Sequence, residues 1–260
     1  MLDKFSVALG EYDTGWHDPA RSLREVKKLA GKARDAGARL LVLPEMCTTG
    51  FTMDAPNRAE PIDGESVRRL GDIARDHSIW LIAGVATRSD GVNLNSAIAL
   101  APSGDTFAVY HKQKLFGYAS EDTVYSTGTG PCVFALDGVS VALFVVFDLR
   151  FPELFREVAR EADVMVVIAN WPTTRQKHWE ILTQARAIEN QCYLVAVNRT
   201  GRGGGLDYAG GSVILDPWGN RCDREIEGGI SIGEVGKQRV AEVRKNFPIG
   251  NSPSRAVSTR

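Results

Sequence analysis

The sequence lacks an excess of charge of either sign, and it lacks long apolar runs. Its 260 residues carry 31 lysines and arginines against 32 aspartates and glutamates, a formal charge of −1. A general nucleic-acid binder needs a basic surface to replace the counterions of the phosphates, so this balance argues against that class of protein. Apolar runs such as residues 141–147 are far shorter than the roughly 20 residues of a membrane-spanning helix. We therefore expect neither a nucleic-acid partner nor a membrane partner.

Cysteine and histidine are also scarce. The four cysteines (Cys47, Cys132, Cys192 and Cys222) are scattered along the chain, as are the four histidines, and there is no Cys-x-x-Cys pair. This spacing predicts neither a disulfide framework nor a metal site, so we expect a reduced protein without metal or cofactor. Residues 1–5 lack the basic start that precedes the apolar segment of a signal peptide, which favours a cytoplasmic protein.

The sequence does have an alternation of helix-like and strand-like segments. Asp18 and Pro19 predict the start of a helix and Gly37 its end, with apolar positions at helical spacing between them. The continuous apolar run at residues 40–43 predicts a strand that is covered on both faces. Further helices are expected over residues 65–77, 153–161 and 179–190, and further strands over residues 5–10, 80–85, 96–100, 106–110, 139–147, 164–169 and 193–198.

Hairpins interrupt this alternation. Residues 102–105 (Pro-Ser-Gly-Asp) form a connector of hairpin length between two strand-like segments. The mixture favours one layered α/β domain with mixed sheets over a purely parallel sheet. The glycine-rich residues 201–205 are expected to form a surface loop. We expect a single domain over residues 1–245, followed by a C-terminal arm or tail over residues 246–260.

Polar residues follow three of the predicted strands. Glu45 comes after residues 40–43, Lys112 comes after the strand that ends at Tyr110, and residues 146–150 close the longest apolar strand. If they converge, they supply a base, a cation for a developing oxyanion and an elbow for a nucleophile. Spacing alone leaves plainer interpretations open: Glu45 as a solvated loop residue, Lys112 as part of a basic surface, and Asp148 with Arg150 as a structural ion pair.

Several ordered segments carry a resemblance that changes this balance. Residues 43–51 (Leu-Pro-Glu-Met-Cys-Thr-Thr-Gly-Phe) resemble the first signature of the nitrilase superfamily, the carbon-nitrogen hydrolases. Residues 110–116 (Tyr-His-Lys-Gln-Lys-Leu-Phe) are similar to the second signature, and residues 147–153 (Phe-Asp-Leu-Arg-Phe-Pro-Glu) are similar to the third. The resemblance covers nearly the whole chain, with further matches at residues 169–172, 184–191, 197–199 and 208–212.

The resemblance implies a four-layer α-β-β-α sandwich of the nitrilase type, in which helices cover two mixed sheets. Members commonly pair, so we expect a homodimer with contacts through the helix from residue 179 and the C-terminal arm. Glu45 is then the general base, Lys112 stabilises the oxyanion and Glu121 is a second glutamate. The position of the catalytic cysteine, directly before Phe147, is occupied by Val146. The backbone N–H of Phe147 is expected to contact the oxyanion together with Lys112.

The substrate is less well defined by the resemblance. Asn170, Trp171 and Arg175, with the segment around Tyr208, most resemble the bacterial ω-amidase branch, which hydrolyses the terminal amide of α-keto acid amides such as α-ketoglutaramate. Arg175 is the candidate for binding the substrate carboxylate through two parallel hydrogen bonds, although a solvent-exposed loop arginine fits equally well. Residues 114–116 depart from the usual form of the branch. A nitrile hydrolase or an N-carbamoyl-amine hydrolase of the same superfamily would use the same catalytic residues, so these alternatives stay open.

Val146 changes the expected activity. A valine can neither attack an amide carbonyl nor carry an acyl group, so the covalent route is closed. Either the cysteine of a working enzyme was replaced to trap a ligand or silence the reaction, or the protein is a natural pseudoenzyme that binds without catalysis. The intact remaining motifs favour the first interpretation. Cys47 and Cys192 are expected to be buried structural thiols that do not replace the missing nucleophile.

Overall fold

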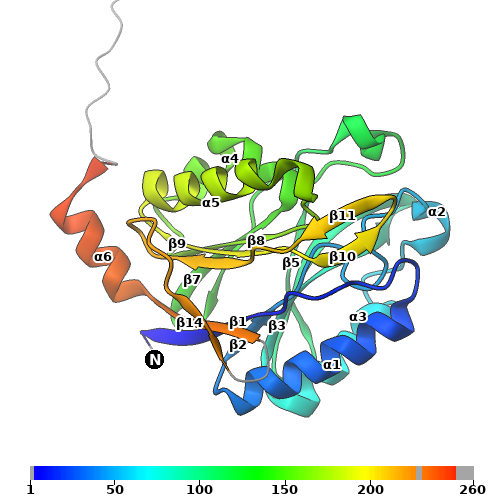
Figure 1. The fold of residues 1–260 in the computed structure, drawn as a ribbon, viewed down its shortest axis with the longest axis horizontal. Coiled ribbons are helices and arrows are strands. Elements are labelled where there is room, and N and C mark those ends of the chain that lie inside the picture. Colours follow the sequence, from blue (N-terminus) through cyan, green and yellow to red (C-terminus); the bar gives the residue numbers. More distant parts are fainter. Residues whose placement is uncertain (1–2, 227–229, 250–260) are drawn as a thin grey trace, which may run out of the picture.

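Two β-sheets stacked face to face form the centre of the molecule (Figure 1). The structure is a computed structural model that describes residues 3–226 and 230–249. The strands of the seven-stranded sheet are, in spatial order, β13 (Asp223–Ile226), β14 (Ile230–Gly236), β1 (Lys4–Leu9), β2 (Leu40–Val42), β3 (Trp80–Ser89), β4 (Val92–Leu100) and β5 (Thr106–His111). Those of the five-stranded sheet are β12 (Val213–Leu215), β9 (Tyr193–Val197), β8 (Val164–Ile168), β7 (Val139–Val145) and β6 (Val133–Leu136).

Helices cover the outer face of each sheet, which confirms the predicted four-layer α-β-β-α sandwich. Helices α1 (Pro19–Asp35) and α3 (Glu65–His77) pack on the seven-stranded sheet, at the bottom of Figure 1. Helix α5 (Gln176–Asn190), with α4 (Pro152–Val158) beside it, covers the five-stranded sheet at the top. The remaining helical elements are short or peripheral: α2 (Ala55–Arg58), η1 (Gly117–Ala119), η2 (Glu121–Thr123), η3 (Val146–Arg150), η4 (Thr173–Arg175) and α6 (Lys237–Asn246).

Local sequence signals set both ends of α1. The side chain of Asp18 accepts a hydrogen bond from the backbone N–H of Arg21, and Pro19 is the first helical residue, as predicted. Gly37, just beyond the helix, has φ +77°, a conformation that glycine adopts without steric cost. The chain then enters β2, whose three residues are all buried. The loop that follows β2 carries Glu45.

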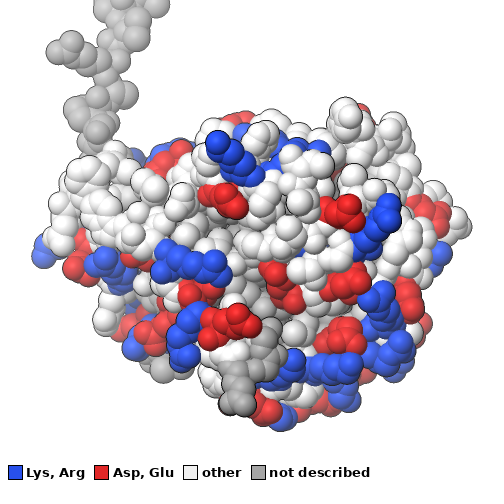
Figure 2. Space-filling view, viewed as in Figure 1, with Lys and Arg blue, Asp and Glu red and all other residues white. Residues whose placement is uncertain are grey.

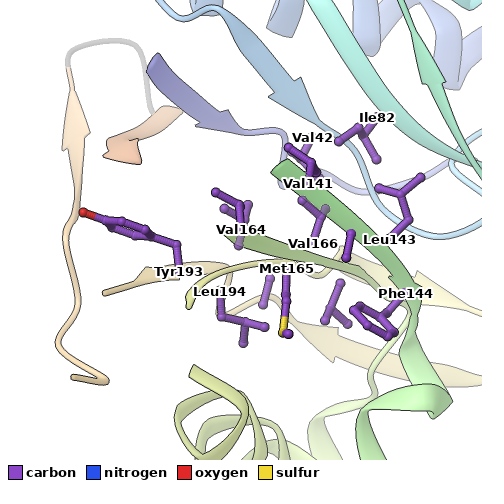
Figure 3. Packing of buried hydrophobic residues seen from close by; sticks show 14 of the residues in the cluster. Val42, Ile82, Val141, Leu143, Phe144, Val164, Met165, Val166, Tyr193 and Leu194 are labelled. Atoms are coloured by element: carbon purple, nitrogen blue, oxygen red, sulfur yellow. The ribbon is translucent and has the colours of Figure 1, made fainter. Parts of the chain in front are cut away.

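The core lies between the two sheets. Figure 3 shows Val42 and Ile82 of the seven-stranded sheet directed toward Val141 and Leu143 of the five-stranded sheet. Each of these four side chains is at most 1% exposed. Full burial of such a side chain contributes about 1.5–3 kcal/mol. This apolar contact holds the sheets in register with each other and thereby sets where their strand ends meet.

Three local predictions were wrong in detail. Strand β7 ends at Val145 rather than at residue 147, because Oδ2 of Asp148 accepts a hydrogen bond from the Val145 N–H (3.0 Å) and the chain turns into η3. Residues 201–205 belong to a two-stranded hairpin, β10 (Thr200–Gly203) and β11 (Leu206–Ala209), rather than to a loop. Helix α6 extends to Asn246, so the predicted arm starts inside a helix, and residues 250–260 lie outside the described residues.

The surface carries charges of both signs. Figure 2 shows basic and acidic side chains interspersed over the visible face, in keeping with the formal charge of −1. Within residues 3–226 and 230–249, none of the helices combines the length and the hydropathy that crossing a bilayer requires.

Candidate active site

A pocket of about 350 Å³ lies where strand ends from both sheets meet. Glu45 follows β2, Lys112 follows β5, Val146 follows β7 and Asn170 follows β8, and all four line the pocket. Ligand sites of α/β proteins commonly lie just beyond the ends of their strands. The other lining residues are mostly aromatic, apolar or cationic: Trp16, Phe51, Met53, Phe116, Ala119, Phe147, Arg150, Trp171, Pro172, Arg175, Gly204, Leu206 and Tyr208.

Two of the lining residues, Glu45 and Lys112, belong to a buried group of polar side chains that we call the inner cluster: Glu45, Lys112, Glu121 and Asn95. Glu121 and Asn95 contact the other two but do not line the pocket themselves. Nζ of Lys112 lies 2.8 and 2.7 Å from the two carboxylate oxygens of Glu121 and 3.3 Å from Oε1 of Glu45. The three charged side chains are at most 1% exposed. The structure thus brings together the three residues that the sequence resemblance singled out as base, cation and second glutamate.

Asn95 bridges the two carboxylates of the inner cluster. Its Nδ2 donates to Oε1 of Glu45 at 2.7 Å and to Oε1 of Glu121 at 2.9 Å. The sequence motifs did not identify this residue, which is fully buried on β4. The available signal was the polar pair Asn95-Ser96 inside an apolar strand, because a buried amide without partners is costly.

Asn170 holds the second carboxylate oxygen of Glu45. The backbone N–H of Asn170 donates to Oε2 of Glu45 at 3.0 Å, and its Nδ2 donates to the Glu45 backbone carbonyl at 2.7 Å. The carbonyl oxygen of the Asn170 side chain has no hydrogen-bond partner among the described residues. Asn170 therefore orients Glu45 through both its backbone and its side chain.

Burial controls the protonation of the inner cluster. It raises the pKa of Glu45, an effect that Lys112 opposes and Glu121 reinforces. Burial alone would lower the pKa of Lys112, but the charges of Glu45 and Glu121 outweigh it and the pKa is raised. The lysine therefore stays charged beside a carboxyl group whose pKa lies above its usual value. This pairing suits oxyanion stabilisation together with proton transfer.

Val146 is the first residue of η3 and lines the pocket with 8% of its surface exposed. The four cysteines all lie in the described part of the chain, and none of them lines this pocket. Cys47 and Cys192 are fully buried, as predicted, and burial raises their pKa values to about 12 and about 11. They are therefore poor candidates for a thiolate nucleophile.

A further buried carboxyl group, Asp148, holds the η3 turn. Its Oδ2 accepts hydrogen bonds from the Tyr110 hydroxyl at 2.8 Å and the Val145 N–H at 3.0 Å, and its Oδ1 accepts from the Lys114 N–H at 2.9 Å. Its partners are thus a hydroxyl and two backbone N–H groups. The sequence-based alternative of a structural ion pair between Asp148 and Arg150 is therefore wrong. Burial raises the pKa of Asp148 to about 6.

Two partly exposed arginines, which we call the outer arginines, also line the pocket: Arg150 and Arg175. Arg150 lies over the ring of Trp171 at 4.7 Å from its centroid, and Arg175 lies over the ring of Phe116 at 5.4 Å. Burial, followed by the charge of Arg175, lowers the pKa of Arg150. Neither makes an ion pair with an acidic residue of the described chain. Two neighbouring guanidinium groups without an acidic partner suit the binding of a carboxylate.

The described residues contain no group of three or more histidine, cysteine, aspartate or glutamate side chains arranged to hold a metal ion. Of the residues predicted to bind substrate, the structure places Phe147, Asn170, Trp171 and Arg175 in the lining of the pocket. The sequence did not identify Trp16, Arg150, Gly204 or Leu206 as parts of the same site, although it singled out the segment around Tyr208.

Comparison with known proteins gives a consistent result. The family model for carbon-nitrogen hydrolases matches residues 6–245. The 2-oxoglutaramate amidase of Bacillus subtilis (strain 168) is 33% identical over 250 residues, which cover 95% of this chain and 96% of that protein. A solved structure of a carbon-nitrogen hydrolase superfamily protein from Xanthomonas campestris, with an arsenic adduct in its active site, is 30% identical with a TM-score of 0.89, and the match covers 98% of this chain and 100% of that chain. A mutant of the amidase from Nesterenkonia sp. AN1, showing Michael addition of acrylamide at its active-site cysteine, is 28% identical with a TM-score of 0.81, and the match covers 95% and 100% of the two chains.

Proposed function

We propose that this chain, which belongs to the carbon-nitrogen hydrolase family, binds a small amide that carries a carboxylate, in the manner of an ω-amidase, and that Val146 leaves it without the nucleophile needed for hydrolysis. The observation that carries the proposal is the lining of one pocket by Glu45, Lys112 and Val146, with no cysteine among the lining residues. The proposal has two parts, the chemistry of the amide end and the recognition of the carboxylate end.

The amide end is the inner cluster. In the family reaction a thiolate attacks the amide carbonyl, the C–N bond breaks with loss of ammonia, and water hydrolyses the thioester that remains. Lys112, together with the backbone N–H of Phe147, stabilises the oxyanion of each tetrahedral intermediate. Glu45 takes the thiol proton, passes a proton to the leaving ammonia and later activates the water. Every one of these roles has a residue in this chain except that of the nucleophile.

The position of the nucleophile falls on Val146. It is the residue directly before Phe147 in the segment that resembles the third signature, and it follows β7 at the wall of the pocket. The Nesterenkonia amidase has an active-site cysteine that adds to acrylamide, which supports thiol chemistry at this place in the family. A valine side chain has no group that forms a bond to an acyl carbon, so the thioester route is closed in this chain.

The carboxylate end is the pair of outer arginines. The Bacillus relative acts on 2-oxoglutaramate by its name, an amide whose far end is a carboxylate. Arg175 and Arg150 lie together in the pocket without acidic partners in the described chain, and a guanidinium binds a carboxylate through two parallel hydrogen bonds. This arrangement supports an ω-amide over a simple neutral amide.

The test is to supply the nucleophile. Valine and cysteine are similar in size, so Val146→Cys is expected to fold and to release ammonia from amides such as 2-oxoglutaramate, whereas Val146→Ser is expected to do so weakly, because a hydroxyl is much harder to deprotonate. Adding Glu45→Gln to the cysteine variant is expected to abolish the activity. Robust turnover by the unmodified protein that survives Glu45→Gln would refute the assignment.

The same experiment separates the alternatives. Including a nitrile and an N-carbamoyl amine in the substrate panel tests the other reactions of the superfamily, since a carbamoyl substrate releases carbon dioxide with ammonia. A folded Val146→Cys protein that is inactive on the whole panel would instead support a natural binding protein whose site has changed beyond its nucleophile. The valine itself is the observation that favours this second candidate.

A homodimer is a separate part of the proposal. On α5, the side chains of Ile181 and Ile188 are 54% and 47% exposed, and Phe247, just after α6, is 54% exposed. Apolar side chains exposed on these two elements support pairing through them. Light scattering of the purified protein is expected to give twice the mass of one chain, and Ile181→Lys is expected to shift it toward the monomer.

A further inference from the structure

The pocket has more flat apolar surface than a short linear amide needs. Six aromatic side chains line it: Trp16, Phe51, Phe116, Phe147, Trp171 and Tyr208. Its volume of about 350 Å³ lies within the range of about 300–1,000 Å³ that is typical of sites for larger organic ligands. The inner cluster and the outer arginines can bind the two polar ends of a ligand. The aromatic side chains can then contact the part of the ligand between these ends.

Trp16 is one of these aromatic side chains, and its neighbours fix the position of its ring. Its ring stacks on His17, with ring centroids 4.9 Å apart and planes 16° apart. Nε2 of His17 lies 2.7 Å from Oγ1 of Thr52, and His17 has φ +53°, a conformation that a non-glycine residue adopts only where the surroundings enforce it. Three glycines, Gly50, Gly203 and Gly204, lie against the Trp16 ring. A Cβ atom added at any one of them would lie only 2.8–3.0 Å from an atom of this ring.

An ion pair joins the segment of Trp16 to Arg199, the residue directly before the β10–β11 hairpin. Nη2 of the buried Arg199 donates to Oδ1 of Asp13 at 2.8 Å and to the backbone carbonyl of Thr14 at 3.1 Å. The guanidinium of Arg199 also lies over the ring of Tyr208, 4.6 Å from its centroid. Trp16 and the β10–β11 hairpin, which carries Tyr208, therefore form one continuous wall of the pocket.

We propose that Trp16 is a specificity-determining residue, and that the site prefers amides with a flat, aromatic body between the amide group and the carboxylate. The inference rests on the proposed function, in which the inner cluster takes the amide and the outer arginines take the carboxylate. The body of the ligand then packs against Trp16, whose ring is held at its edge and on one face while 38% of the residue remains exposed. A flexible chain offers less contact area to this wall and loses more conformational freedom on binding.

The experiment compares two amides on the unmodified protein by isothermal titration calorimetry. The probes are 4-carbamoylbenzoate, which has a flat body, and adipamate, a linear amide whose two ends are separated by four carbons, as they are along the shortest path around the ring of 4-carbamoylbenzoate. We expect 4-carbamoylbenzoate to bind about tenfold more tightly. Trp16→Ala is expected to remove this preference, because it weakens the binding of the aromatic amide alone. Trp16→Phe is expected to keep most of the preference.

Trp218→Ala provides a matched control. Trp218 is a similarly exposed tryptophan (45%) that lies outside the pocket lining and packs against Phe247. This variant is expected to leave both dissociation constants unchanged. Circular dichroism and thermal unfolding establish that each variant is folded, and Trp16→Phe keeps the test decisive if Trp16→Ala does not fold.

The outcomes separate this inference from the proposed function. If adipamate binds and the preference for the aromatic amide is absent, or is unchanged in the folded Trp16 variants, the inference fails while the proposed function stands. If neither amide binds the unmodified protein, the proposed function fails and the inference fails with it. An equal effect of Trp218→Ala would also overturn the inference, because the change would then not depend on the pocket.

Discussion

The inner cluster and the outer arginines place charge in the same pocket in opposite ways. In the inner cluster, Lys112 is almost fully buried and lies within 3.3 Å of carboxylate oxygens of both Glu45 and Glu121. The outer arginines, Arg150 and Arg175, are partly exposed and contact aromatic rings rather than acidic side chains of the described chain. In the inner cluster the charges pair with one another within the protein, whereas the guanidinium groups of the outer arginines are available to pair with a ligand.

Loss of a cation is therefore expected to have different consequences in the two regions. A buried charge without its partner costs several kcal/mol, because neither water nor another group replaces the lost interaction. A partly exposed charge without an acidic partner contributes little to folding. Residues of the inner cluster are therefore expected to affect stability and chemistry together, and the outer arginines are expected to affect binding alone.

The largest effect is expected for Lys112→Met. The substitution leaves two buried carboxylates without a cation, so the free energy of unfolding at pH 7 is expected to fall by about 3–5 kcal/mol. Urea denaturation followed by circular dichroism measures this change. The matched variant Arg175→Met is expected to stay within about 0.5 kcal/mol of the unmodified protein. Equal losses in the two variants would remove the distinction between the two regions.

Asp148 sharpens the comparison, because it is a buried carboxyl group without a directly paired cation. Burial raises its pKa to about 6 from the usual 3.8. Between these values the folded protein binds more protons than the unfolded chain, so the free energy of unfolding decreases as the pH rises. The decrease from Asp148 is expected to total about 2–3 kcal/mol between pH 4 and pH 6.

Asp148→Asn isolates this contribution, because asparagine does not titrate. Glu45, whose pKa is also raised, contributes a slope of the same sign to both proteins. The difference between the stability curves of the two proteins across this pH range therefore belongs to residue 148. Parallel curves would show that the carboxyl group ionises normally in the folded state.

The smallest of these effects is expected for Arg175→Ala, which is expected to change ligand binding but not stability. The dissociation constant for 2-oxoglutaramate is expected to rise about tenfold through loss of a charge-assisted hydrogen bond. The constant for a neutral amide of similar size is expected to stay unchanged. Calorimetry on the unmodified valine protein measures both constants without turnover. A similar loss for both amides would place Arg175 outside carboxylate recognition.

The sequence predicted those parts of the molecule that depend on local pattern. Apolar periodicity located α1 and α3 together with most strands, and the ordered motifs identified Glu45 and Lys112 at two strand ends. Asn95 was not identified, because its role depends on the spatial match with Glu45, which lies 50 positions earlier in the chain. The elbow at residues 146–150 was predicted but the end of β7 was placed two residues too late, since that end depends on the hydrogen bonds that the Asp148 side chain makes with neighbouring backbone.

Trp16 illustrates the same limit. As a single aromatic residue in a loop it has no periodic pattern around it, and its place in the pocket results from contacts with Gly50, Gly203 and Gly204. The first two of these glycines are separated by most of the chain. Contacts of this kind depend on the complete packing of both sheets, which no local pattern of residues specifies.

The position of β1 in its sheet has a consequence for synthesis of the protein. β1 lies between β2 and β14, and it pairs with β14 from Lys4↔Gly236 to Leu9↔Ser231. A ribosome adds about 5–20 residues per second, so roughly 10–45 s pass between the emergence of these two strands. Throughout that interval one edge of a buried, apolar strand has no partner and is open to pairing with other chains. Nascent chains that stop short of β14 are thus the form of this protein most in need of a chaperone.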